Sequence, residues 1–250
     1  PRVRHGVGHA LRRQQPVRYG HHRGRAAAGG AGNPQGAAEA PRPRRPHPAV
    51  ALPAGDADAL YEYCLYLLER RRWVPLAEAA ARGLDPLRLR NVFDWFFQGG
   101  AGDAAVRLWA AAAGGEPGFA NGSLEQPLRG WGLDWVAWPV DRVRVERRRE
   151  DGGYRLDVEF LRPGNIDYSG LTHDFAVSPG RQYRLRLEAR AEAIESASGP
   201  AVEVISHRRR LAISEAFRRT TPWRAVELRF RPAADERLCR LRLIRQPTSR

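Results

Sequence analysis

Lysine and methionine are both absent from this chain of 250 residues, and cysteine occurs only twice. All 42 basic residues are therefore arginine. Together with abundant Ala, Gly and Pro, this indicates a GC-rich coding sequence rather than selection for phosphate contacts. Cys64 falls on an apolar helical face and Cys239 in an alternating strand, so we expect two small buried residues rather than a disulfide or a zinc site. Because the chain begins with proline and has no methionine, we expect a fragment or a processed product.

Long apolar runs are missing as well. The sequence has no stretch of about 18 apolar residues, and its N-terminal region is basic without an apolar segment, so neither a membrane span nor a visible signal peptide is supported. Gly-x-Ser-x-Gly, His-Glu-x-x-His and phosphate-loop motifs are also absent. Asp and Glu are numerous enough for a two-carboxylate site, but the sandwich portion is too short to hold both a cleft and a distinct catalytic domain. We therefore expect a protein that is not an enzyme.

The net charge of +14 is unevenly distributed. Residues 1–50 contain ten Arg and one Glu, whereas the rest of the chain interleaves acidic and basic residues. Residues 1–53 have hardly any large apolar side chains, so they cannot offset the conformational entropy of ordering and are predicted to be disordered. Specific nucleic-acid binding is not expected of the folded part. Binding through the basic tail is the weakest of three functional hypotheses.

Residues 54–118 have a helical period. Apolar residues recur every three or four positions from Leu60 to Leu68, after Asp56 or Asp58 as an N-cap. Three further helices, each ending at glycine, are predicted over 75–82, 86–98 and 103–113. The two helix pairs resemble a degenerate tetratricopeptide array, in which hairpins stack to cover their apolar faces, and a plain four-helix packing unit is the alternative.

Residues 119–250 change to a period of two. Alternating apolar and polar residues, separated by Gly, Pro, Asn and Asp, predict strands near 143–145, 154–160, 183–189, 202–204, 226–230 and 239–243. Strands with one polar face suit an antiparallel sandwich with a buried core between its sheets. The predicted fold class is therefore α+β and multidomain, with an all-β sandwich behind a small helical array.

Three segments of this region resemble jelly-roll carbohydrate-binding modules of the family 4 and 9 kind. The segment NGSLEQPLRGWGLDW, residues 121–135, is similar to their first strand; residues 166–192 are similar to their middle, and residues 218–230 to a late strand that follows Thr-x-Trp. A helical repeat in front of such a module resembles bacterial tetratricopeptide proteins associated with exopolysaccharide production and export. That resemblance implies a jelly-roll sandwich, a glycan ligand and a periplasmic or cell-envelope location.

Two positions depart from the family pattern. Leu124 stands where the family usually has Phe, and the chain stops before a last strand of the Leu-Trp-Leu-Asp-Asp-Val type. Related modules often hold a structural calcium between a Glu of the first strand and an Asp of the last strand. Glu125 matches the first position and is the candidate metal ligand. Because the second position has no counterpart, we expect Glu125 to be a solvated or capping carboxylate, and we expect no other cofactor.

Sugar recognition needs flat aromatic surfaces beside planar polar groups. The aromatic candidates are Trp135, Trp138 and Tyr168. Trp135 and Trp138 are three residues apart and cannot both face one side of a strand, so at least one should face solvent or another domain. Trp131 and Trp223 lie in the family-like motifs and are expected to be core anchors. The candidate polar partners are Asp167 and His173, with Asn165 and Arg162 as further possibilities.

These observations favour a non-catalytic glycan-binding or glycan-scaffolding protein that serves cell-surface polysaccharide production or export. Its helical segment would contact a protein partner. The alternative is a structural protein–protein interaction module whose sandwich does not bind sugar.

Overall fold

The computed structural model describes residues 5–8, 56–150, 152–161, 165–196 and 198–247, which belong to one compact unit. Of the segment predicted to be disordered, residues 5–8 form a short strand, β1 (His5–Gly8). Residues 1–4 and 9–53 lie outside the described residues. The disorder prediction therefore does not hold for β1 and stays a prediction for the remainder.

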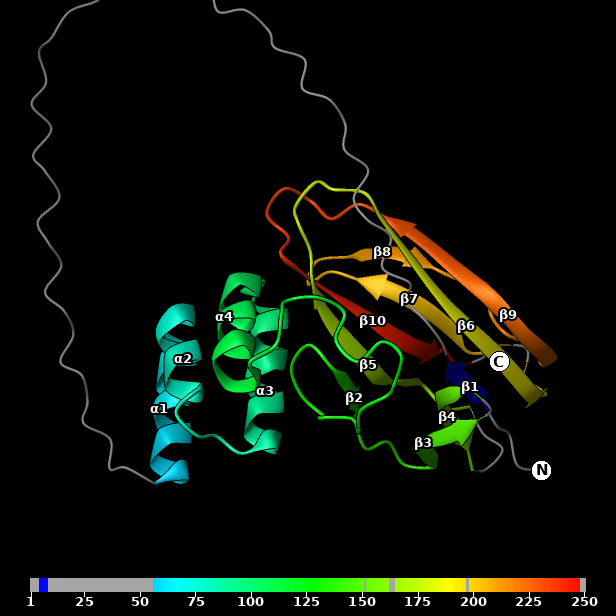
Figure 1. Cartoon of the computed structure of the whole chain (residues 1–250), viewed down its shortest axis with the longest axis horizontal. Coiled ribbons are helices and arrows are strands. Elements are labelled where there is room, and N and C mark those ends of the chain that lie inside the picture. The colour runs from blue at the N-terminus through cyan, green and yellow to red at the C-terminus, as the bar shows by residue number, and fades with distance from the viewer. Residues whose placement is uncertain (1–4, 9–55, 151, 162–164, 197, 248–250) are drawn as a thin grey trace, which may run out of the picture. The chain divides into compact units, whose positions relative to one another are not determined.

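Among the described residues, four helices precede the strands β2 to β10: α1 (Ala57–Glu69), α2 (Trp73–Ala80), α3 (Pro86–Gln98) and α4 (Gly102–Ala113). Helix α1 packs on α2, and α4 packs on both α2 and α3. Figure 1 shows them gathered at one side of the sheets. Their positions confirm the helical period of this region. The tetratricopeptide resemblance stays a prediction.

Local signals fix the helix ends. The Asp56 carboxylate accepts hydrogen bonds from the backbone N–H groups of Asp58 and Ala59 at 3.1 and 2.9 Å, so it caps α1 as the sequence predicts. Asp85 caps α3 in the same way, with Pro86 at the first helical position. Helix α4 ends at Gly114, whose φ of 65° lies in the left-handed region that favours glycine.

Within the described part of the chain, ten strands form two five-stranded sheets in which all paired strands are antiparallel. Sheet A has the order β3 (Val143–Glu150), β4 (Gly153–Phe160), β1, β6 (Tyr183–Ile194) and β9 (Arg219–Phe230). Sheet B has the order β2 (Trp135–Ala137), β5 (Tyr168–Ala176), β10 (Leu238–Arg245), β7 (Ala201–Ile205) and β8 (Arg210–Ile213). The α+β layout is confirmed.

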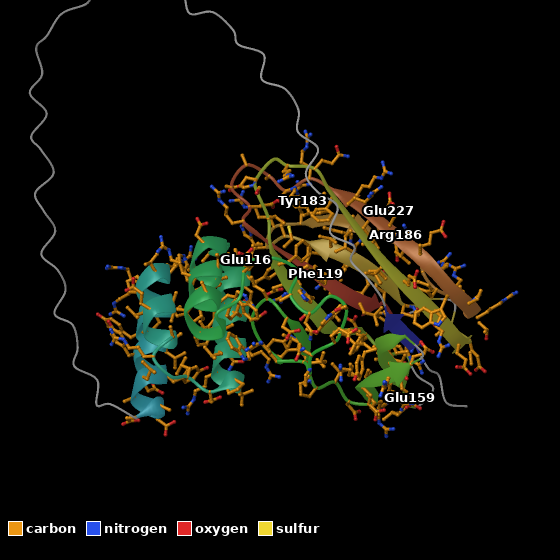
Figure 2. The ribbon with its side chains drawn as sticks, viewed as in Figure 1. Glu116, Phe119, Glu159, Tyr183, Arg186 and Glu227 are labelled. Atoms are coloured by element: carbon orange, nitrogen blue, oxygen red, sulfur yellow. The ribbon has the colours of Figure 1, made fainter. Side chains whose placement is uncertain are left out.

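One apolar core collects buried side chains from both sheets, including Leu156 and Leu187 from sheet A and Leu171 and Leu241 from sheet B. Strand β6 shows the alternation that the sequence predicts, since Leu185, Leu187, Ala189 and Ala191 are buried between more exposed residues. Figure 2 shows Arg186 of β6 and Glu227 of β9, which are paired in register and exposed. Sheet A therefore has one apolar face and one charged face.

The segment from Asn121 to Trp135 is a loop that enters a strand only at Trp135, so the expected first strand over this stretch is wrong. Asn121 and the buried Asp134 organise this loop. The Asn121 amide donates to the Gln126 carbonyl at 3.0 Å and to the Asp134 carboxylate at 3.2 Å, and Asp134 also accepts from the Arg129 N–H at 3.2 Å. The resemblance to a first strand is therefore carried by residues with a loop-closing role.

An aromatic cluster joins this loop to the helices. The Trp131 ring lies 5.8 Å from Phe93 and 5.5 Å from Trp109, measured between ring centroids. Gly132 is required next to it, because its φ is 77° and a Cβ there would lie 2.4 Å from a Trp109 ring carbon. Trp131 is a buried anchor, as predicted, and its packing partners are helical.

Candidate functional site

Trp135 is not a surface aromatic. It is only 5% exposed, its ring N–H donates to the Asn121 carbonyl at 3.2 Å, and its ring packs edge-on against Phe119 and His173. Tyr168 is 1% exposed and packs edge-on against Phe160, and burial raises the pKa of its hydroxyl. The expected exposure of both rings is therefore wrong: they fill the core and offer no face to a sugar.

His173 is a core residue as well. Its ring is fully buried and stacks on Phe119 with centroids 3.7 Å apart, in the region where Figure 2 labels Phe119. Its Nε2 lies 2.7 Å from the Ala120 carbonyl oxygen, which can only accept, so Nε2 carries the proton. Burial lowers the pKa of His173 to about 4, and the ring is neutral at pH 7. It cannot serve as an exposed polar partner for a glycan.

The remaining predicted polar residues that the structure describes are exposed. Asp167 and Asn165 are exposed in the segment before β5, and Arg162 lies outside the described residues. Glu125 is exposed, and its backbone carbonyl accepts from the Arg147 guanidinium at 2.9 Å. Among the described residues no group of three or more His, Cys, Asp or Glu side chains is placed to hold a metal ion. The residues present around Glu125 do not fit a calcium site.

Trp138 differs from the other predicted aromatics. It follows β2, is half-buried, and its backbone N–H donates to the Gly170 carbonyl at 2.8 Å. The Arg90 guanidinium of α3 lies 4.4 Å from its ring centroid. Of the pair Trp135 and Trp138, one therefore faces the core and the other faces the helical segment, in agreement with the three-residue spacing.

Helix α3 also contributes to a partly buried aromatic pair on another of its faces. Tyr61 of α1 and Trp95 of α3 stack with ring centroids 5.8 Å apart and an angle of 25° between the rings. The Asn91 amide donates to the Tyr61 hydroxyl at 3.2 Å, and the Arg88 guanidinium lies 5.2 Å from the Tyr61 centroid. We name these residues, together with the Trp138 contact, the α3 patch: Tyr61, Arg88, Arg90, Asn91, Trp95 and Trp138.

The helical repeat explains how one helix serves two surfaces. Arg88, Asn91 and Trp95 follow the i, i+3, i+7 spacing and share the face toward Tyr61. Arg90, Asp94 and Phe97 follow the i, i+4, i+7 spacing and meet sheet B. Trp95 thus lies outside the buried stripe of Leu89, Val92, Phe93 and Phe96. A tryptophan outside the apolar stripe of a helix is the signal in the sequence that could have indicated a surface role for Trp95.

A buried ion pair fixes α3 to sheet B. The Arg240 guanidinium of β10 contacts both oxygens of Asp174 at 2.6 and 3.0 Å and reaches Asp94 of α3 at 2.8 Å, while Phe97 covers it at 4.0 Å. Burial raises the pKa of Asp174, and the neighbouring Arg240 opposes that effect. The bidentate pairing with Asp174 fixes the Arg240 guanidinium, and its further contact with Asp94 holds α3 against sheet B.

Two buried carboxylates elsewhere also pair with arginine, and a third, Glu236, accepts from a backbone N–H. Asp157 pairs with Arg155 at 2.7 Å, and the fully buried Glu203 pairs with Arg210 at 2.5 Å and with Arg242. Glu236 accepts from the Ala233 N–H at 2.6 Å. A charge buried without a partner is costly, so removing the arginine partner of Asp157 or Glu203 would destabilise the fold.

Cys64 and Cys239 are free and buried, which confirms the expected small core residues. Burial raises the pKa of Cys64 to about 11. No helix among the described residues combines the length and the apolar character that a membrane crossing requires. A comparison of the chain with known protein families, with curated proteins and with solved structures found no match in any of the three.

Proposed function

We propose that this chain is a non-catalytic glycan-binding module that contacts its polysaccharide through the α3 patch. The observation that carries the proposal is the partly buried Tyr61–Trp95 stack beside the Asn91 amide, together with Arg90 of the same helix, whose guanidinium lies over the ring of Trp138. Aromatic rings offer a flat apolar surface to the C–H face of a pyranose. Planar amide and guanidinium groups hydrogen-bond to its hydroxyls.

The rest of the chain supports such a patch as a scaffold. The Arg240 contact and the Trp131 cluster tie helices to sheet B and to the loop before it, so the aromatic side chains are held by fixed elements. A jelly-roll connection of the two sheets, and a role in cell-surface polysaccharide production or export, follow from the sequence resemblance and form part of this proposal. The exposed face of the helical segment would bind the protein partner.

The test begins with a glycan array probed with the full chain, followed by calorimetric titration of the best ligand. Trp138→Ala and Trp95→Ala should each weaken binding several-fold or more, because each removes a stacking contact on the order of 1 kcal/mol. Trp223→Ala is the matched control. Trp223 is a half-buried aromatic on β9 of sheet A, near Arg190, and its replacement should leave affinity unchanged.

Circular dichroism of each variant separates lost binding from lost folding. Equal losses for Trp138→Ala, Trp95→Ala and the Trp223→Ala control would refute the α3 patch as the glycan site. If no glycan on the array binds the folded chain, the structural interaction module replaces glycan binding as the function. The rigid connection between helices and sheet B would then serve assembly alone.

A further inference from the structure

Arg90 is the one arginine of the described residues that has a buried side-chain nitrogen without a hydrogen-bond partner. That nitrogen is Nε, and no hydrogen bond or ion pair joins the guanidinium to any other residue in the described part of the chain. The two terminal nitrogens are not buried in this way and stay open to solvent. A buried donor that loses water without gaining an acceptor is costly, so Arg90 calls for a partner that these residues do not supply.

Packing holds the Arg90 side chain in place. Its guanidinium lies 4.4 Å from the ring centroid of Trp138, whose backbone N–H donates to the Gly170 carbonyl at 2.8 Å. The helix that carries Arg90 is tied to sheet B by the contact of Arg240 with Asp94 at 2.8 Å. Contact with a ring face uses the positive charge and leaves the terminal N–H groups free to donate. The guanidinium is therefore positioned before a ligand arrives, which lowers the entropy cost of binding one.

Sheet A contains a similar arginine–tryptophan contact in which a carboxylate is present. The Arg190 guanidinium of β6 lies 5.0 Å from the ring centroid of Trp223, and it also reaches the Glu150 carboxylate at 3.6 Å. Both arginines are partly buried, and both lie over a partly buried tryptophan. Arg90 thus has the aromatic contact of Arg190 and lacks its carboxylate. The comparison indicates which chemical group would complete the contact of Arg90 with Trp138.

The carboxylates nearest in the sequence to Arg90 and to Trp138 are engaged with other arginines. Asp94, one turn further along α3, pairs with Arg240 at 2.8 Å. Asp141, three residues after Trp138, pairs with Arg142 at 3.0 Å. Neither forms an ion pair with Arg90, so its charge is left for an anion that comes from outside the described residues.

We propose that the missing partner of Arg90 is a carboxylate of the glycan, so that the α3 patch selects an acidic polysaccharide that contains uronic acid residues. This inference rests on the proposed glycan-binding function and names its substrate class. The carboxylate accepts from the two terminal nitrogens, since Nε is covered. The planar guanidinium matches a carboxylate in shape, and hydrogen bonds between charged groups are stronger than those between neutral ones. The aromatic rings contribute affinity for the pyranose, and Arg90 distinguishes the acid from the neutral sugar.

Matched pairs of glycans test the proposal. Oligogalacturonate, oligoglucuronate and oligomannuronate are each titrated into the full chain by calorimetry, beside the same fragment with its carboxyl groups reduced to primary alcohols. For at least one pair, the acidic fragment should bind about tenfold more tightly than its reduced form, because only the acid makes charge-assisted hydrogen bonds to Arg90. Poly-glutamate has carboxylates without sugar rings and should not bind. Poly-glutamate that binds as tightly as the acidic fragments would overturn the proposal, because charge alone would then explain the affinity.

Two variants assign the preference to its residue. Arg90→Gln should abolish the preference for the acidic form, because the amide keeps a planar donor and loses the charge. Arg190→Gln is the matched control, since Arg190 has a similar aromatic contact and is already paired with Glu150, and this variant should keep the full preference. Circular dichroism checks that both variants are folded.

The outcomes separate this inference from the proposed function. Equal affinity for acidic and reduced fragments, with binding that still depends on Trp95 and Trp138, would overturn the selection of acidic glycans and leave the α3 patch as the glycan site. Equal effects of Arg90→Gln and Arg190→Gln would also overturn the role of Arg90. If no fragment of either form and no glycan on the array binds the folded chain, the proposed function fails and this inference fails with it.

Discussion

Acid should destabilise this protein through His173, because its buried ring stacks on Phe119 and has no room for the hydration of an imidazolium. Burial lowers the pKa of His173 from an ordinary value of 6.5 to about 4; the Ala120 carbonyl and the nearby Asp134 act in the opposite direction but are outweighed. Between pH 6.5 and about 4, His173 is protonated in the unfolded chain but stays neutral in the folded chain. The stability gained from the neutral ring is therefore complete above pH 6.5 and is lost as the pH falls toward 4.

The size of this effect follows from the two pKa values. One pKa unit corresponds to about 1.4 kcal/mol, so the full loss below pH 4 is about 3 kcal/mol, and ~2.5 kcal/mol is already lost at pH 4.5. Such a loss is a large fraction of the 5–15 kcal/mol that typically stabilises a domain. His173→Gln keeps an amide donor for the Ala120 carbonyl and has no proton to gain.

Urea unfolding of both chains at pH 7 and pH 4.5 measures the difference. The parent should lose ~2.5 kcal/mol more than the His173→Gln variant over this range. Carboxylates shared by both chains contribute equally to the pH dependence and cancel in the comparison. Parallel losses in the two chains would show that His173 is protonated without cost in the folded state, and the buried neutral ring would be refuted.

Two further predictions concern the connection between helices and sheets. Arg240→Leu should lower the free energy of unfolding by about 3–5 kcal/mol, because it leaves the buried Asp174 carboxylate without its charged partner. Asp94→Asn should lower it by less than about 1 kcal/mol, since Asp94 is partly exposed. Chemical denaturation checks both, and similar costs would contradict the assigned burial. Trp131→Ala should lower the free energy of unfolding by about 3–5 kcal/mol, because it leaves a cavity against the helices. Trp223→Ala should lower it clearly less, because the Trp223 ring is half-buried. Thermal unfolding that ranks the two variants in the reverse order would refute this.

The sequence predicts the local elements well where one physical signal dominates. Helix α3 begins and ends at the predicted residues because Asp85 and Pro86 mark its start and a glycine pair marks its end. Strand β5 shows no clear alternation because Thr172, His173 and Asp174 are all buried, the last beneath a helix. A strand covered on both faces loses the period of two on which prediction depends. The sequence does not predict strand β1, because Val7 is the one residue among its four that favours a strand and two of the others are glycine.

The candidate site is harder to predict for a related reason. Alternation separates the two faces of a strand but does not reveal which residues a neighbouring loop or helix covers, and this places Trp135 and Tyr168 in the core against expectation. Trp138 keeps partial exposure because the strand ends before it. Trp95 and Tyr61 come together from two helices, and only tertiary packing reveals that pair.

The place of β1 in sheet A also determines the order in which the fold can be completed. Its partners on β4 and β6 lie about 150 and 180 residues further along the chain, so this ladder is the most non-local contact of the sheet. Closing so large a loop costs entropy before any pair compensates for it, and such contacts form late. During synthesis the hairpin of β3 and β4 can form first, and β1 can dock only after β6 has emerged. Until then the middle of the sheet presents two unsatisfied strand edges, which is the stage at which the chain is most prone to pair with another copy.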